Sequence, residues 1–593
     1  MSRYPINTLA ILAFAVAAMI ACASMQARTL APEVPLKKRV QEAEKVFIGV
    51  LKNKKILEGD WCHAELKVTH AIKGVKVDEL VPVVWRPKAA QFDAKINQQG
   101  LAVLKNSHNK SYWLRPDTFA DVKLAEQAAK AIDTKSARQP NVLLICIDDL
   151  NDWVGCLQGH PQVLTPHIDR LAKRGVLFTN AHCQAAVCEA SRTSFMTGKL
   201  PSSTGLYLLG PGLRASPVLK DAKTLPEHFA DHGYETLGVG KIYHHLSGLE
   251  TFQTYGPNQS FGPLPKKEDG GKINYKQGHP LWDWGAFPSD EKAMPDYRIA
   301  TWAVEQIQQK RDKPLFLAIG LCRPHVPMYA PPKYFDMYPP LDEIVLPEVK
   351  TDDRDDIPDY GKRLTAGFPA PRHAWFLERT DDMQWQKAVK AYLASITLAD
   401  AQVGRVLDAL DKSEMAQNTI VVLLSDHGFH MGEKQRWAKR SLWSESTRVP
   451  FIIAGPRIKP HRKSHQPVGL IDMYPTLVEL CGLKDPGDLE GLSLTPQLED
   501  VNKKRVPTLS TWWVDNHAII SERYRYIRYA DGSEEFYDHQ NDPHEWHNLA
   551  GNKEVAMLIK QHQEHLPKVN YPALTGNILL GCDPKDRTLF NVE

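Results

Sequence analysis

The sequence predicts an α/β protein: a large, mostly parallel sheet sandwiched by helices, a small antiparallel sheet subdomain at the C-terminal end and an extra β-rich domain at the N-terminal end. Near-continuous apolar runs at 141–147, 315–320 and 420–424 favour this class, because strands buried on both faces of a parallel sheet carry such runs. Helical patterns alternate with these runs, as in repeated β–α units. After Thr508 the pattern changes to short alternating segments that are typical of antiparallel strands.

Length and charge exclude some classes of protein. With 593 residues, the chain is long enough for several domains, or for one large α/β domain with smaller companions. Its 73 Lys and Arg residues nearly balance 70 Asp and Glu residues, and the formal net charge is +3. This balance does not indicate a nucleic-acid-binding protein, so we expect charge to act locally, in a pocket.

Residues 1–27 resemble a secretory signal peptide. Arg3 precedes an apolar run that ends near Cys22 and is short for a membrane span, and residues 21–23 provide a small-residue cleavage pattern. We therefore expect an exported protein, periplasmic or extracellular, without a transmembrane span. Residues 19–22 also resemble a bacterial lipoprotein cleavage box, which leaves a lipid anchor at Cys22 as an alternative.

Residues 28–137 predict a small β-rich domain. Strand-like segments such as 46–51 and 80–85 alternate with turns that contain lysine and glycine. Its role stays open between a passive spacer and a glycan-binding module. We expect the main α/β domain at 138–507, followed by the antiparallel subdomain and a tail at 508–593.

The first strand of the main domain, residues 141–147, ends in Asp148 and Asp149. Open α/β sheets bind ligands at the carboxyl ends of their strands, so these two carboxylates are candidate site residues. The magnesium-binding strand of a nucleotide hydrolase is an alternative. That alternative requires a Gly-x-x-x-x-Gly-Lys-Ser/Thr loop, which the sequence lacks.

Three further predicted strands also end in polar residues. The strand at 235–239 is followed by Gly240-Lys241-Ile242-Tyr243-His244, the strand at 315–320 by Arg323-Pro324-His325-Val326-Pro327, and the strand at 420–424 by Ser425-Asp426-His427-Gly428. Taken singly, Lys241 and His244 are more often solvated surface groups, but a shared position at strand ends favours a site. Residues 247–296 and 329–376 show little periodicity and predict long loops over this edge of the sheet.

Cys188 is the most informative of nine cysteines, which form no Cys-x-x-Cys pair and so predict neither a zinc site nor a disulfide framework. It precedes a predicted helix, and Arg192 lies one turn further along the same face. A thiol at a helix N-terminus beside a guanidinium is suited to binding or attacking an anion. A buried free cysteine is the simpler alternative.

Six motifs occur in the order seen in the type I sulfatases, and resemble the iduronate-2-sulfatase branch most. They are Asp148-Asp149, Cys188-Glu189-Ala190-Ser191-Arg192, the segments 240–244, 323–327 and 425–428, and Trp437-Ala438-Lys439. The resemblance covers roughly residues 140–565 and implies an alkaline phosphatase-like sulfatase fold. Ala190 stands where proline is commoner in the family.

The resemblance also implies a mechanism. A maturation enzyme would convert Cys188 to Cα-formylglycine, whose hydrate attacks the sulfur of a sulfated sugar or polysaccharide. One calcium ion would be bound by Asp148, Asp149, Asp426, His427 and residue 188. Arg192 would make the attacking hydroxyl more acidic, Lys241 and Lys439 would bind the sulfate, His325 would protonate the leaving oxygen, and His244 would accept the proton that allows sulfate to leave.

Two alternatives remain open from the sequence. A phosphatase or phosphodiesterase of the same superfold would use two metal ions with more His and Asp ligands, whereas Lys241 and Lys439 favour a sulfatase. A non-catalytic glycan-binding protein is the alternative if Cys188 is not oxidised. The resemblance suggests a uronate 2-O-sulfate as substrate, in a glycosaminoglycan or an algal polysaccharide.

Overall fold

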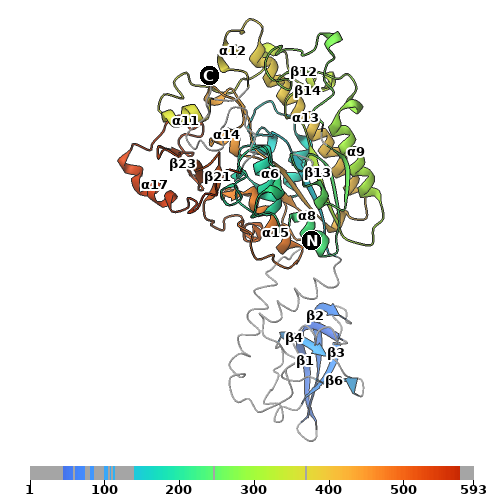
Figure 1. Cartoon of the computed structure of the whole chain (residues 1–593). Helices are drawn as coiled ribbons and strands as arrows, with labels where there is room; N and C mark the ends of the chain where they lie inside the picture. Colours follow the sequence, from blue (N-terminus) through green and yellow to red (C-terminus); the bar gives the residue numbers. More distant parts are fainter. Residues whose placement is uncertain are drawn as a thin grey trace. The chain divides into compact units, whose positions relative to one another are not determined.

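The computed structural model describes residues 139–574, apart from 245–246, 259 and 367–369, and the backbone of six strands between residues 45 and 113. The expected signal peptide and the alternative lipid anchor at Cys22 lie outside the described residues. The chain divides into two compact units, Met1–Arg138 and Gln139–Glu593 (Figure 1).

The N-terminal unit contains one sheet with the strand order β4-β1-β2-β3-β6-β5. β1 pairs antiparallel with β2 and β4, whereas β3 and β6 are parallel. The strands are β1 (Lys45–Leu57), β2 (Trp61–Lys73), β3 (Leu80–Trp85), β4 (Gln99–Leu104), β5 (Ser107–His108) and β6 (Ser111–Trp113).

The second unit is built around an eight-stranded sheet with the order β11-β10-β13-β7-β15-β18-β8-β19. Neighbours are parallel from β10 to β15, and β18 runs antiparallel to both β15 and β8. The mostly parallel sheet predicted from the apolar runs is confirmed. Its strands are β7 (Asn141–Ile147), β8 (Gly175–Phe178), β10 (Glu235–Gly240), β11 (Thr254–Asn258), β13 (Leu315–Leu321), β15 (Thr419–Ser425), β18 (Phe451–Ala454) and β19 (Arg462–Ser464).

Helices cover both faces of this sheet. Side chains of β7 alternate between the faces: Leu143 and Ile145 pack into one core, Val142 and Leu144 into the other. The first core contains α5 (Pro166–Lys173), α9 (Pro295–Gln308) and α13 (Gln384–Asp411), and the second contains α6 (Cys188–Thr197), α8 (Leu225–Asp231) and α15 (Met473–Leu480). Helices α9 and α13 lie side by side in Figure 1.

A small antiparallel sheet follows at the C-terminal end, as the alternating pattern after Thr508 predicted. Its order is β21-β22-β23-β24, and α17 (Ala556–Gln563) packs on it through Ile559. The strands are β21 (Thr508–Thr511), β22 (His517–Ile520), β23 (Tyr524–Arg528) and β24 (Glu534–Asp538).

Shorter elements complete the unit. The long segments predicted as loops are joined by β12 (Trp284–Ala286) and β14 (Met328–Ala330), which pair with each other. The remaining short strands are β9 (Ala181–His182), β16 (His430–Met431), β17 (Trp437–Ala438) and β20 (Val468–Gly469), and the remaining helices are α7 (Pro201–Thr204), α10 (Pro332–Phe335), α11 (Asp359–Leu364), α12 (His373–Leu377), α14 (Ser444–Thr447) and α16 (Thr495–Glu499). Among the described residues, no helix combines the length and the apolar character that a membrane span requires.

Candidate active site

Helix α6 begins at Cys188 itself, one residue earlier than the start predicted just after it. Val187 before it is extended (φ −157°, ψ 142°), and the helix ends at Gly198, whose positive φ of 69° suits glycine and whose N–H donates to the Ser194 carbonyl. All ten residues of α6 are buried, so this helix start lies inside the protein. Its first turn presents the positive end of the helix dipole to whatever residue 188 carries.

The carboxyl ends of the central strands meet beside Cys188. Backbone hydrogen bonds extend the ladder past the strand ends: Asp148 N–H donates to Leu321 O, Lys241 N–H to Gly320 O, and Asp426 N–H to Ile147 O. Residues far apart in sequence are thus held at one edge of the sheet, as expected for strand-end ligand sites.

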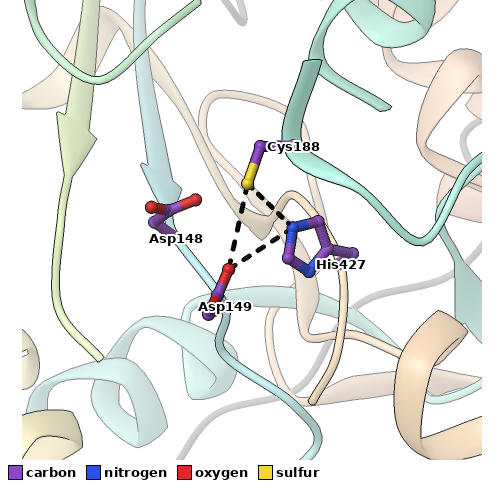
Figure 2. A group of neighbouring side chains, drawn as sticks. All are labelled: Asp148, Asp149, Cys188 and His427. Carbon is purple, nitrogen blue, oxygen red and sulfur yellow. Dashed lines mark hydrogen bonds and ion pairs between the residues drawn. The ribbon is translucent and has the colours of Figure 1, made fainter. Parts of the chain in front are cut away.

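Four of the predicted metal ligands form one compact group. Asp148, Asp149, Cys188 and His427 each offer a ligand atom within 4.8 Å of the others, and all four are buried (Figure 2). Cys188 Sγ lies 3.2 Å from His427 Nε2 and 4.0 Å from Asp149 Oδ1. The other ring nitrogen of His427 donates to Gly428 O at 3.0 Å, because a carbonyl only accepts, and this leaves Nε2 directed into the group.

Asp426, the fifth predicted ligand, is tied to the same group through Arg192. Arg192 Nε donates to Asp426 Oδ2 at 2.8 Å, and its Nη2 lies 3.2 Å from Asp148 Oδ1. Asp426 Oδ2 is also 3.6 Å from His427 Nε2. The fully buried guanidinium therefore bridges the ends of β7 and β15 and fixes two carboxylates relative to Cys188.

Two lysines from distant parts of the chain lie beside Cys188. Lys241 Nζ lies 3.5 Å and Lys439 Nζ 3.6 Å from the sulfur. Lys241 also donates to Asp148, and Lys439 to both oxygens of Asp149 at 2.6 and 2.8 Å. Both ammonium groups are buried, so each acts at close range in a region with little water to screen it.

His325 also reaches the group, on the side of Asp149. Its Nδ1 bonds to Val326 O at 2.5 Å, and its Nε2 lies 3.9 Å from Asp149 Oδ2. Because the carbonyl accepts, Nδ1 carries the proton of that bond and Nε2 is the nitrogen available for proton transfer. His244 is half-buried, three residues beyond Lys241, and its assigned role stays a prediction.

The electrostatics favour an anion at position 188. Burial alone raises the pKa of the Cys188 thiol, but Lys241 and Lys439 outweigh burial and hold that pKa well below its usual value. Burial disfavours the charged form of His427, yet Asp426 and the Cys188 thiolate raise its pKa to about 9. Burial raises the pKa of Asp149 to about 6, against the attraction of Lys439.

Asp149 and Asp426 are each held in place by a residue that the sequence analysis did not single out. Asp149 adopts a left-handed backbone, with φ of 61°, and the Tyr392 hydroxyl holds it by donating to its carbonyl oxygen at 2.6 Å. Ser191 Oγ donates to the carbonyl oxygen of Asp426 at 2.5 Å. Ser191 stands in the cysteine motif, which was a signal, whereas Tyr392 lies within a long amphipathic helix and has none.

The C-terminal sheet anchors the loop that carries Lys439. Arg525 of β23 donates to the Leu442 carbonyl oxygen at 2.7 Å and pairs with Glu545 at 2.6 Å. Lys434, buried at the other end of the loop, pairs with Asp353 at 2.7 Å and donates to the Glu545 carbonyl oxygen. The position of Lys439 therefore depends on contacts from outside the central sheet.

The donor set fits a hard divalent cation. Asp148, Asp149 and Asp426 supply the carboxylate oxygens that calcium prefers, and His427 adds one nitrogen. The three carboxylates are already matched by three buried cations, Arg192, Lys241 and Lys439. A divalent ion would leave a net positive charge, which an anionic substrate would neutralise.

Comparisons with known proteins identify the family of the chain. The family model described as "Sulfatase" matches residues 140–483, and the model described as "N-sulphoglucosamine sulphohydrolase, C-terminal" matches residues 432–571. The chain is 39% identical over 449 residues to a sulfatase of Formosa agariphila, covering 74% of this chain and 88% of that protein. It is 32% identical over 400 residues to iduronate 2-sulfatase of Mus musculus, covering 58% of this chain and 69% of that protein.

Solved structures share the fold. A 2-O glycosaminoglycan sulfatase has a TM-score of 0.56 and 25% identity, over 72% of this chain and 91% of that one. A phosphonate monoester hydrolase of Agrobacterium radiobacter has a TM-score of 0.59 and 20% identity, over 72% of this chain and 94% of that one, and at that identity the likeness concerns the fold alone.

Proposed function

The chain belongs to the sulfatase family and is a sulfuric ester hydrolase, and from this premise we propose that it removes 2-O-sulfate from a uronate-containing sugar by a formylglycine-dependent mechanism. The observation that carries the proposal is the position of Cys188. It lies at the buried start of α6 between two ammonium groups, at 3.5 and 3.6 Å, beside the group of acidic residues.

In this proposal Asp148, Asp149, Asp426, His427 and residue 188 would hold a calcium ion, which would supply positive charge near the nucleophile. The converted residue 188 supplies the nucleophilic oxygen. Lys241 and Lys439 hold the oxygens of the sulfate, and Arg192 keeps Asp148 and Asp426 in place for the ion. Cations fixed before the reaction stabilise charge that develops on the sulfuryl oxygens without reorganising at that moment.

His325 is the group that we assign to the leaving oxygen. Its Nε2 faces the site while its Nδ1 is engaged with the Val326 carbonyl oxygen, so a proton at Nε2 can pass to the departing sugar oxygen. Burial, Lys439 and Lys241 hold the pKa of His325 well below its usual value, and a bound sulfate acts in the opposite direction. We assign to His244 the later removal of a proton from residue 188.

The sugar is inferred from relatives. Iduronate 2-sulfatase, which is 32% identical over 400 residues, and the 2-O glycosaminoglycan sulfatase both name position 2 of the sugar. This supports a uronate 2-O-sulfate in a glycosaminoglycan or an algal polysaccharide. The proposal includes a formylglycine-generating maturation enzyme as partner and export to the periplasm or the cell exterior, with a lipid anchor at Cys22 as the alternative form.

The phosphatase or phosphodiesterase alternative is disfavoured by the two lysines, since Lys439 donates to Asp149 and Lys241 to Asp148, whereas a second metal ion would need further carboxylate or imidazole ligands. Assaying a sulfate and a phosphate ester of the same phenol side by side tests this. We expect faster turnover of the sulfate, and the reverse order would support the alternative.

The experiment that tests the mechanism is the mass of the tryptic peptide of residues 175–192, from protein made in its native host. Conversion to formylglycine removes one sulfur and two hydrogens and adds one oxygen, so the two forms separate cleanly. We expect the aldehyde or its hydrate in active material. Active protein with an intact thiol at Cys188 would contradict the mechanism, and inactive protein with that thiol would support the glycan-binding alternative.

A further inference from the structure

Phe261 lies over two groups of the proposed site. It belongs to the long segment predicted as loop, beyond β11, and it is half-buried. Its ring stacks on the imidazole of His325, with centroids 4.5 Å apart and an interplanar angle of 26°. The same ring is 5.1 Å from Lys241 Nζ. One aromatic side chain thus contacts the assigned acid and one assigned sulfate ligand.

Arg323 stabilises this stack through hydrogen bonds to the backbone of both residues. Its fully buried guanidinium donates to Phe261 O at 3.0 Å and to His325 O at 3.3 Å, and its Nε donates to Tyr329 O at 3.1 Å. The loop that carries Phe261 and the strand end that carries His325 are therefore fixed to each other by one planar group. Three backbone carbonyl oxygens accept hydrogen bonds from this single buried cation, so the relative position of the two segments is well defined.

Stacking restricts how the imidazole can turn. The Nδ1 bond to Val326 O defines one edge of the ring, and Phe261 covers one of its faces. Rotation of the ring away from the site would break the first contact and push against the second. With both contacts in place, Nε2 stays on the side of Asp149, where a leaving oxygen would be.

We propose that Phe261 is a positioning residue for proton transfer to the leaving group, acting through the ring of His325 and supporting Lys241. The inference rests on the proposed function. In the step concerned, the bond between sulfur and the leaving oxygen breaks, its electron pair stays on that oxygen, and the proton passes from His325 Nε2 to it. A leaving group that is stable as an anion needs no such proton, whereas an alkyl or sugar oxygen does.

The test compares two sulfate esters with Phe261→Leu, which keeps apolar bulk and removes the aromatic face. We expect kcat for a sugar or phenyl sulfate to fall by at least about 10-fold, a part of the 10²–10⁴ that general acids contribute. For 4-nitrophenyl sulfate, kcat should change by no more than about 2-fold, since that leaving group requires little protonation. KM should change little for either ester.

Three controls separate positioning from general damage. Phe261→Tyr keeps the stack and should retain the wild-type ratio of the two rates. Phe335→Leu changes another half-buried phenylalanine, in α10, and should alter both rates equally. In a His325→Ala background, Phe261→Leu should no longer distinguish the two esters. The formylglycine content of every variant is matched by peptide mass.

The outcomes distinguish the inference from the function on which it rests. If wild-type protein hydrolyses both esters and Phe261→Leu slows them by the same factor, the positioning role is wrong and the sulfatase mechanism stands. If wild-type protein with formylglycine at 188 hydrolyses neither ester, the positioning role and the proposed mechanism are both wrong. A selective loss that Tyr rescues supports the inference.

Discussion

Lys439 occupies a backbone stretch that few side chains tolerate. Ala438 before it and Arg440 after it both have positive φ angles, 103° and 73°. Arg436 Nη2 donates to the Lys439 carbonyl oxygen at 3.1 Å, which helps to keep this conformation. Left-handed residues of this kind cost of order 1–3 kcal/mol each and persist where surrounding contacts hold them. The ammonium group is thus delivered to Asp149 by a constrained loop rather than by a regular element.

Replacing Lys439 tests its assigned role at the scale of a residue. We expect Lys439→Ala to lower kcat by roughly 10²–10³-fold, the usual cost of removing one preorganised group that stabilises developing charge. Steady-state rates with an aryl sulfate measure this. Lys310→Ala, at a side chain that is 89% exposed, is the matched control and should retain full activity. Unchanged kcat in Lys439→Ala protein would remove this lysine from the mechanism.

Much of the residue-level site could be predicted because its members follow recognisable strands or stand in short motifs. Asp148, Lys241 and Asp426 follow apolar runs, and the structure brings Lys241 to Cys188, Asp148 to Lys241 and Asp426 to His427 beside Cys188. Tyr392 and Phe261 could not be predicted in the same way. An aromatic residue within a helix or an irregular loop is ordinarily part of the core or surface, and only the folded chain shows what its ring or hydroxyl contacts.

At the scale of elements, the C-terminal sheet is part of the support of the site. Glu545 lies fully buried after β24 and accepts from Ser444 N–H at 3.0 Å, besides pairing with Arg525 and with His539 at 2.8 Å. The strands of this sheet could be predicted from the alternating segments after Thr508. The hydrogen bond from Arg525 of β23 to the Leu442 carbonyl oxygen in the Lys439 loop could not be predicted, because partners 83 residues apart leave no local pattern.

The buried charge of Glu545 should make the free energy of unfolding depend on pH. Burial alone raises the pKa of its carboxyl, but Arg525 and His539 hold that pKa well below the usual range. A carboxyl whose folded-state pKa is lowered stabilises the protein above its unfolded pKa of about 4.3, and this contribution is lost as pH falls below that value. We therefore expect Glu545→Gln to lower the unfolding free energy at pH 7 by about 3–5 kcal/mol, as for a broken buried pair.

Urea unfolding followed by tryptophan fluorescence, at settings of about pH 3.5 to 7.5, measures this effect. The unfolding free energy falls with urea concentration by roughly 1–3 kcal/mol/M in small proteins and by more in larger ones. The difference between wild type and Glu545→Gln should narrow toward the acid end. Glu522→Gln, which removes an exposed pair with Lys504, should cost no more than about 1 kcal/mol. A difference that stays constant with pH would show that the Glu545 charge is not what stabilises the fold.

At the scale of the whole molecule, the chain separates into two compact units, and every candidate site residue lies in the second. The fold class of that unit could be predicted from buried apolar strands and intervening helices. The direction of β18 could not, because a buried antiparallel strand is as apolar as a parallel one. The domain limits of 28–137, 138–507 and 508–593 remain our proposal.

Deleting residues 28–135 tests whether the first unit takes part in the chemistry. We expect kcat/KM for a small aryl sulfate to stay within about 2-fold of the full-length value, because the second unit has its own core, as independent domains do. Activity on a polymeric substrate measured in parallel shows whether the first unit contributes to binding glycans. Loss of small-ester hydrolysis in a folded, formylglycine-containing deletion variant would place part of the site in the first unit.

If Cys188 is converted to formylglycine as proposed, its burial limits when the converting enzyme can reach it. The sulfur is enclosed by groups that are synthesised much later, His427 after 239 further residues and Lys439 after 251. At about 5–20 residues per second, synthesis of that stretch takes roughly 10–50 s. During this interval the cysteine is already made while Lys439 is not, and His427 is missing for most of it. We expect an oxidising enzyme to reach the thiol in that interval, so that slowing or hastening elongation between codons 188 and 439 changes the fraction of active molecules.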